Sequence, residues 1–272
     1  MAKQTTIAAE ISLKGVGLHT GQEVTMTFKP APVNNGFTFV RVDLEGQPII
    51  EADANYVVNT QRGTNLEKLG VMIQTPEHVL AALVGCDLDN VIIELNASEL
   101  PIMDGSSKYF VEAIEKVGVV EQEAERKIFV VKDVISYLDE ATGSEITVIP
   151  SDEYCVTAMV DFGTKVLGTQ NATMKGIKEF KKEISNCRTF SFLHELESLL
   201  NNGFYLSFGK YLLRNPDLEK VFTFAPENQV LLETDTIEES IYQVYEKAAS
   251  IKGISVEEMK TIVFTNFSKI FG

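Results

Sequence analysis

The chain has 272 residues, of which 44% are hydrophobic, and a formal net charge of −15. This length allows two domains with cores of their own, and the composition is that of a folded globular protein. No apolar run reaches the length of a membrane span, and the first residues lead into a strand-like pattern rather than a signal peptide. We therefore expect a cytoplasmic protein without stable membrane insertion. The acidic charge opposes general attraction to a phosphate backbone and so disfavours nucleic acid as a partner.

The cysteines indicate a reducing compartment. Cys86, Cys155 and Cys187 are odd in number, widely spaced and form no Cys-x-x-Cys pair. This pattern is typical of reduced thiols rather than of a disulfide framework or a cysteine-rich zinc site.

The chain opens with strands and turns. Apolar and polar residues alternate over residues 5–42, and Asn34-Asn35-Gly36 predicts a tight hairpin in an antiparallel arrangement. The three glycines of Gly15-Val16-Gly17-Leu18-His19-Thr20-Gly21 allow two interpretations: the backbone approaches a ligand, or it forms a bulged turn.

A Glu-His pair follows at a predicted helix start. Thr75 can cap the helix with its hydroxyl, and Pro76 suits the first helical position. Glu77 and His78 then lie in the first turn, where the helix dipole disfavours imidazolium and keeps His78 in the neutral form that a metal needs. A neighbouring carboxylate could accept a proton from water. The alternative is a structural histidine beside a glutamate that only complements the helix dipole.

The first half ends in further regular elements. We expect a strand at 91–95, a loop at 99–107 that is either an anion nest or a serine-capped turn, and a helix at 108–117. The charged residues 121–126 separate two apolar regions. We place a domain boundary there, after a first domain at 1–120.

The second half restarts with strands. Alternating patterns predict them at 127–131, 145–149 and 154–160, and a helix is expected near 176–184. Arg188 and Thr189 precede an aromatic pair and form either a site wall or a strand end.

The C-terminal part has clear helix signals. Thr236 with Glu239, and Ser255 with Glu258, have capping-box spacing, and Gly253 suits the break between two helices.

Several motifs together resemble one enzyme family. They are, in chain order, the Gly-Val-Gly-Leu-His-Thr-Gly loop at 15–21, Arg-Gly-Thr at 62–64, Thr-Pro-Glu-His at 75–78, Asp-Asn at 89–90, Pro-Ile-Met-Asp-Gly-Ser at 101–106, and Arg-Thr-Phe at 188–190 with Phe-Leu-His-Glu at 192–195. From about residue 5 to residue 201 this order resembles the zinc-dependent UDP-3-O-acyl-N-acetylglucosamine deacetylases of lipid A synthesis. The resemblance implies an α+β fold of two similar sheet-plus-helix domains with the active site between them. It also implies an acylated UDP-sugar as substrate, in the cytoplasm of a Gram-negative type of bacterium.

The resemblance also implies roles for single residues. Glu77 matches the general base and His78 one zinc ligand, while Thr189 matches the hydroxyl that helps to stabilise the oxyanion. Further matches concern substrate contacts and are Leu18, His19, Phe190 and Phe192. In this chemistry Zn²⁺ polarises the amide carbonyl and lowers the pKa of water.

The sequence departs from that family in its later part. The family's remaining two zinc ligands lie in a later His-x-x-x-Asp segment, and a further histidine lies near the C-terminus. This chain has only His19, His78 and His194. A catalytic zinc usually needs three protein ligands, so the predicted site is incomplete. His194 lies in an apolar helical run that favours a surface or packing role over recruitment to the metal.

The tail at 203–272 has a different resemblance. Gly203–Gly209, Gln229–Asp235 and the two helices that follow resemble the end of TatD-type metal-dependent deoxyribonucleases. In that family the match to Asp235 is a metal-site residue at the end of a barrel strand; the alternative is a strand end before a helix cap. We therefore expect a partial second deacetylase-like domain at 127–201 and a foreign strand and two-helix tail joined near residues 199–203.

Three functions remain open. The first is zinc-dependent N-deacetylation with Glu77 and His78 as its centre. The second is a catalytically incomplete fusion or truncation product that at most binds the substrate. The third, suggested by the tail alone, is a metal-dependent nuclease that uses Asp235.

Overall fold

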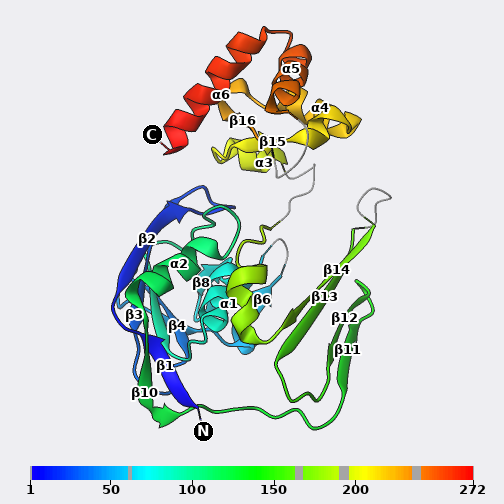
Figure 1. The fold of residues 1–272 in the computed structure, drawn as a ribbon. Coiled ribbons are helices and arrows are strands. Elements are labelled where there is room, and N and C mark those ends of the chain that lie inside the picture. Colours follow the sequence, from blue (N-terminus) through cyan, green and yellow to red (C-terminus); the bar gives the residue numbers. More distant parts are fainter. Residues whose placement is uncertain (1, 61–62, 163–167, 190–195, 235–239, 272) are drawn as a thin grey trace. The chain divides into compact units, whose positions relative to one another are not determined.

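The computed structural model describes residues 2–60, 63–162, 168–189, 196–234 and 240–271 (Figure 1). The chain forms two compact units. The first consists of Met1–Gly17 and Gln22–Thr189, and the second of Leu18–Gly21 and Phe190–Gly272. Both contain helices and strands, which confirms the predicted α+β class.

The first unit is built on a five-stranded sheet in the order β2-β3-β9-β4-β5. Its strands are β2 (Ile11–Val16), β3 (Glu23–Pro30), β4 (Phe37–Arg41), β5 (Ile49–Glu51) and β9 (Val91–Leu95). Alternation in β3 buries Val24, Met26 and Phe28 on one face, as a half-buried strand requires. The antiparallel opening and the strand at 91–95 are therefore confirmed.

The predicted hairpin at Asn34-Asn35-Gly36 is wrong. Asn34 and Gly36 do have positive φ angles of 63° and 67°. However, β3 and β4 do not pair with each other; β9 lies between them, antiparallel to β3 and parallel to β4. The turn residues reverse the chain, but the later strand takes the position that a hairpin partner would occupy.

Two smaller sheets and two helices complete the core of the first unit. β1 (Lys3–Ile7) pairs with β10 (Val119–Glu125), and β6 (Val57–Asn59), β7 (Asn65–Lys68) and β8 (Val71–Gln74) form a meander after the short η1 (Ala54–Tyr56). Helices α1 (Glu77–Gly85) and α2 (Lys108–Val117) bury their apolar faces in the same core. The bounds predicted for α2 are confirmed.

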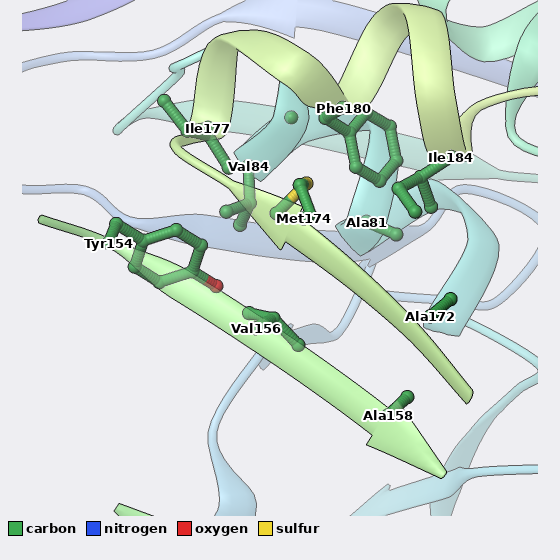
Figure 2. Close-up of a pocket in the computed structure, with 11 residues that line it drawn as sticks. Ala81, Val84, Tyr154, Val156, Ala158, Ala172, Met174, Ile177, Phe180 and Ile184 are labelled. Carbon is green, nitrogen blue, oxygen red and sulfur yellow. The ribbon is translucent and has the colours of Figure 1, made fainter. Parts of the chain in front are cut away.

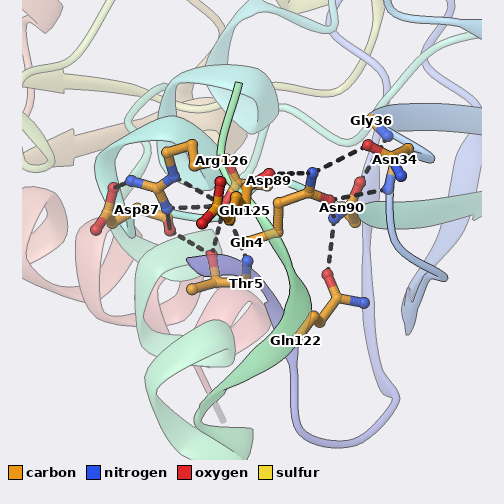
Figure 3. Close-up of polar contacts among 10 residues, drawn as sticks. All are labelled: Gln4, Thr5, Asn34, Gly36, Asp87, Asp89, Asn90, Gln122, Glu125 and Arg126. Carbon is orange, nitrogen blue, oxygen red and sulfur yellow. Dashed lines mark hydrogen bonds and ion pairs between the residues drawn. The ribbon is translucent and has the colours of Figure 1, made fainter. Parts of the chain in front are cut away.

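A buried polar network links β1 and β10 to the residues before β9 (Figure 3). Asn90 is 1% exposed. Its side-chain amide donates to Gln4 Oε1 at 2.9 Å and Gln122 Oε1 at 2.7 Å, and its side-chain oxygen accepts from Gly36 N at 2.8 Å. Beside it, Asp89 accepts from Thr5 N and Arg126. Asp89 and Asn90 thus link β1, β10 and the loop before β4.

Two hairpins follow in the chain. β11 (Ile135–Asp139) pairs with β12 (Ser144–Val148), and β13 (Cys155–Asp161) with β14 (Thr169–Lys175), all antiparallel. The strands predicted at 145–149 and 154–160 are confirmed within one residue.

The strand predicted at 127–131 is wrong. These residues have no strand assignment, and Ile128, Phe129 and Val130 are 66–86% exposed. Alternation alone does not make a strand, because the backbone also needs a partner with which to exchange hydrogen bonds.

Two short non-α helical segments stand where the helix near 176–184 is predicted. They are the 3₁₀ turn η2 (Ile177–Glu179) and the π-helical η3 (Phe180–Ile184). The Phe180 ring lies on Gly85 of α1: a Cβ added to Gly85 would be 2.0 Å from Phe180 Cδ1. The absent side chain at Gly85 therefore determines where η3 packs.

The second unit has its own core. Its elements are α3 (Leu196–Asn201), β15 (Leu206–Phe208), η5 (Lys210–Leu213), α4 (Pro216–Phe224), η6 (Glu227–Gln229), β16 (Val230–Leu232), α5 (Ile241–Lys252) and α6 (Val256–Phe271). β15 and β16 are parallel, and Phe208, Phe222 and Val244 are among the residues that fill the core.

The predicted helix signals in this unit are partly confirmed. Ser255 and Glu258 form the capping box, with Glu258 Oε2 accepting from Ser255 N at 2.8 Å and Glu258 N donating to Ser255 Oγ at 3.2 Å. Gly253 has φ +69° and ends α5. Thr236 and Glu239 lie outside the described residues.

Candidate active site

The Glu-His pair begins α1 as predicted, but its cap differs. Thr75 has φ +57°, its N–H donates to Thr64 O at 2.9 Å and its hydroxyl donates to Glu99 Oε1 at 3.3 Å. Pro76 is the N-cap, without a side-chain capping bond. The prediction that Thr75 caps the helix is therefore wrong, because this left-handed conformation directs the hydroxyl to Glu99.

Glu77 and His78 lie in the first turn of α1. A Glu77 carboxylate oxygen accepts from Thr64 N at 3.3 Å, which connects the pair to the polar segment before β7. Burial lowers the pKa of His78 below its usual 6.5, although Glu77 and Asp104 oppose the shift. His78 is thus favoured in its neutral form near pH 7, in the direction predicted, with burial as the leading cause.

The loop before α2 lies next to this turn. Ser107 Oγ donates to His78 O at 2.9 Å. The Asp104 carboxylate accepts from Ser106 N at 3.1 Å and from Ser106 Oγ at 2.6 Å. This local bonding is that of an Asx turn, so the turn interpretation of Asp-Gly-Ser-Ser is favoured over an anion nest. Ser107, the N-cap of α2, uses its hydroxyl on His78 rather than on its own helix.

The distant segment at 188–189 contacts the same loop. Thr189 N donates to Gly105 O at 2.7 Å, and Arg188 Nε lies 3.5 Å from Asp104 Oδ2. Residues separated by more than 80 positions in the sequence are thus in contact at this loop. Its Asp104 carboxylate raises the pKa of His78, against the larger effect of burial. Arg188 and Thr189 are not in a strand, and the site wall stays a prediction.

The glycine loop also reaches this region through its first residues. Gly15 lies so close to Pro101 that an added Cβ would be 2.8 Å from Pro101 Cβ, and Ile102 N donates to Val16 O at 3.0 Å. Gly15 is therefore needed because the backbone of β2 lies close to the segment at Pro101 and Ile102.

Comparison with known proteins decides the family. The family described as UDP-3-O-acyl N-acetylglycosamine deacetylase (LpxC) matches residues 4–209. This chain belongs to the LpxC family. The TatD related DNase family matches residues 190–272, so the tail is similar to that family.

Named relatives agree with this membership. The chain is 40% identical over 201 residues to the UDP-3-O-acyl-N-acetylglucosamine deacetylase of Myxococcus xanthus, covering 74% of this chain and 63% of that protein. It is 41% identical over 202 residues to the deacetylase of Chromohalobacter salexigens, covering 73% and 66%. It is also 40% identical over 254 residues to the bifunctional enzyme LpxC/FabZ of Bacteroides thetaiotaomicron, covering 93% and 51%. The chain thus spans from about half to about two thirds of the length of these relatives.

The LpxC-type site is described only in part. Leu18 and His19 belong to the second unit, where Asn202 Nδ2 donates to their carbonyl oxygens at 3.3 and 3.2 Å. Phe190, Phe192, His194 and Asp235 lie outside the described residues, so their predicted roles stay predictions.

A zinc ion does not find a full ligand set in the part of the chain that the structure describes. Within those ranges no group of three His, Cys, Asp or Glu side chains could hold a metal ion. A catalytic zinc needs about three protein ligands, and His78 is the one that the family resemblance offers here.

Among the described residues no helix is long and apolar enough to cross a membrane.

Sequence reasoning missed Asp104 as a site residue. Its motif was recognised, but the carboxylate has an evident local role with Ser106, and its effect on His78 arises from the packing of α1 against the loop. No local pattern reports such a contact.

Proposed function

We propose that this chain carries the general-base part of a UDP-3-O-acyl-N-acetylglucosamine deacetylase centre and acts in lipid A synthesis. The observation that supports this most directly is the grouping of Glu77, His78 and Thr189 around the loop that contains Asp104 and Gly105, in a chain of the LpxC family.

The chemistry is divided among these residues. Glu77 accepts the proton of the attacking water, because its carboxylate stands at a helix start beside a neutral imidazole. Thr189 is exposed and held at its backbone by Gly105, which leaves its hydroxyl available to a developing oxyanion. Leu18, His19, Phe190 and Phe192 are the proposed contacts to the acylated UDP-sugar.

Zinc would supply Lewis-acid activation of the amide and of water. His78 is suited to one ligand position because its pKa is lowered and the neutral imidazole is available. The other ligands have to come from outside the described residues. We place the activity in the cytoplasm of a Gram-negative type of bacterium.

A second candidate is substrate binding without hydrolysis. The lack of a three-ligand group within the described ranges favours it. The nuclease alternative rests on the similarity of residues 190–272 to TatD related DNases and on Asp235; the net charge of −15 counts against it.

The test measures three quantities on the whole chain: zinc stoichiometry, calorimetric binding of UDP-3-O-acyl-N-acetylglucosamine, and acetate release with Zn²⁺ supplied. Deacetylation predicts bound substrate and acetate release that His78→Ala abolishes. Substrate binding without acetate release would support the second candidate. Absence of both would overturn the proposed function, and divalent-metal-dependent DNA cleavage that is lost in Asp235→Ala would support the nuclease.

A further inference from the structure

The backbone just before the Glu-His pair has an unusual conformation. Thr75 is 5% exposed and has φ +57°, in the left-handed region that a β-branched residue rarely adopts. It also precedes Pro76, and a residue before a proline favours extended backbone. A conformation of this kind persists only where the surrounding structure holds it, and such residues gather at functional sites.

This conformation also costs α1 a capping bond. The hydroxyl of a threonine at a helix start can accept from a free amide of the first turn, which stabilises the helix. Here the Thr75 hydroxyl instead donates to Glu99 Oε1 at 3.3 Å, and Pro76 is the N-cap without a side-chain capping bond. The structure thus gives up a stabilising bond and gains a link to Glu99.

Glu99 is held in place by its own segment. It is 0% exposed, which is rare for a residue with a carboxylate. Its neighbours bond to the end of β8: Gln74 N donates to Ser98 O at 2.8 Å, and Leu100 N donates to Gln74 O at 3.1 Å. Glu99 is therefore a fixed acceptor for the Thr75 hydroxyl.

The polar contacts continue from Thr75 to the proposed base. Thr75 N donates to Thr64 O at 2.9 Å, and Thr64 N donates to Glu77 Oε2 at 3.3 Å. A continuous series of hydrogen bonds thus runs from Glu99 through Thr75 and Thr64 to Glu77. Linked hydrogen bonds in a protein interior restrict the geometry of the groups that they join.

Packing leaves part of α1 without close neighbours. Val79 and Leu83 are buried in the core, but Ala81 and Val84 line a cavity of about 290 Å³ together with Met174 (Figure 2). A side chain that faces empty space loses packing contacts there. The hydrogen bonds at the first turn therefore matter for the position of this helix and of Glu77.

We propose that Glu99 is a positioning residue for the Glu77 carboxylate and acts through Thr75 and Thr64. It sets the orientation in which Glu77 meets the attacking water. The part that Glu77 plays in proton transfer rests on the proposed function, whereas the link from Glu99 to Glu77 can be tested without catalysis.

Amide hydrogen exchange of the whole chain tests this link. Thr75→Val removes the hydroxyl and keeps the size and branching of the side chain. Relative to amides of β9, Thr64 N–H should then exchange about fivefold faster, as expected for the loss of one hydrogen bond. Thr75→Ser keeps a hydroxyl and should exchange as wild type does.

Ser98→Ala is the matched control. It removes a side-chain bond between the same two segments, from Ser98 Oγ to Gln74 Oε1 at 3.4 Å, and should leave the exchange of Thr64 unchanged. The same exchange of Thr64 in Thr75→Val and wild type would overturn the proposal. Equal acceleration in Thr75→Val and Ser98→Ala would overturn it too, because the effect would then be a general loosening of the two segments.

Kinetics with Zn²⁺ supplied test the role in the proposed reaction. Thr75→Val and Glu99→Ala should lower kcat for acetate release about tenfold and leave KM within about twofold, because the base is misplaced while the substrate contacts stay. Glu99→Gln keeps an oxygen for the Thr75 hydroxyl and should recover most of kcat. If Glu99→Ala does not fold, Thr75→Val and Glu99→Gln decide.

Two kinetic results would contradict the positioning role. They are a loss confined to KM, and a kcat of Thr75→Val equal to that of wild type. No acetate release by wild type would overturn the proposed function instead, and the exchange of Thr64 would then decide the link from Glu99 to Glu77 by itself.

Discussion

The backbone N–H of Thr189 donates to the carbonyl oxygen of Gly105 at 2.7 Å. This bond holds the end of the first unit on the loop that also contains Asp104, whose carboxylate raises the pKa of His78 against the larger effect of burial. It connects the loop before α2 with a segment more than 80 residues later.

The Arg188–Asp104 ion pair is expected to position Thr189 rather than to stabilise the fold. Because Arg188 is 64% exposed and the two groups are 3.5 Å apart, Arg188→Ala should change the free energy of unfolding by no more than about 1 kcal/mol. The rate of acetate release should fall by more than this change in stability accounts for, because the ion pair next to Thr189 no longer holds its backbone on the loop. Urea unfolding and kinetics check both; Arg188→Lys is the control expected to recover part of the activity. Unchanged kinetics for Arg188→Ala would contradict the positioning role.

His78 should make stability depend on pH. Burial lowers its pKa in the folded state below 6.5, so the unfolded chain binds more protons between the two values. The stability of wild type relative to His78→Gln should therefore be full above about pH 6.5 and be lost as the pH falls through the folded pKa. Urea unfolding of both proteins at pH 7.5 and 5 measures it, and a difference independent of pH would refute the shift.

Gly85→Ala should destabilise the first unit. The new methyl would lie 2.0–2.5 Å from ring atoms of Phe180, and overpacking of this kind costs about 1–3 kcal/mol, more than the helix propensity that alanine gains. In a Phe180→Ala background the same change should be neutral or stabilising. Thermal unfolding of the four proteins checks the coupling, and equal effects in both backgrounds would show that the contact is absent.

Asn90→Ala should also be costly. Asn90 is 1% exposed, and its loss leaves the Gly36 N–H and the Gln122 side-chain oxygen without this partner, while the Gln4 oxygen still accepts from Asn34 N; the expected cost is about 1–3 kcal/mol. Asn171→Ala, on the exposed β14, is the matched control and should change stability by less than about 0.5 kcal/mol. Similar midpoints in urea for the two variants would contradict the role of the network.

The sequence predicted a helix well where both its apolar periodicity and its capping residues were present. The helix at 108–117 and the capping box of Ser255 and Glu258 were predicted within the residues observed, since periodicity and caps act within a few residues. The turn residues Asn34–Gly36 predicted the positive φ angles correctly but not the strand pairing, because β3 pairs with a strand more than 60 residues later.

The motifs in the sequence predicted which residues belong to the candidate site, but they did not predict the contacts between those residues. Glu77 and His78 could be placed at a helix start from the sequence, whereas the left-handed Thr75 and the link from Ser107 to His78 depend on packing between loops. The apolar residues of the hairpins predicted strands, but the sequence does not show that they would stay exposed.

Acetate release from UDP-3-O-acyl-N-acetylglucosamine by wild type and Glu77→Gln, with Zn²⁺ supplied, tests the proposed deacetylase centre most directly. Glu77→Gln keeps the shape of the side chain and its acceptor for Thr64 N, but removes the base. We predict release by wild type that falls about 100-fold or more in Glu77→Gln while substrate binding is retained. Equal release by both proteins, or no substrate binding by wild type, would contradict it.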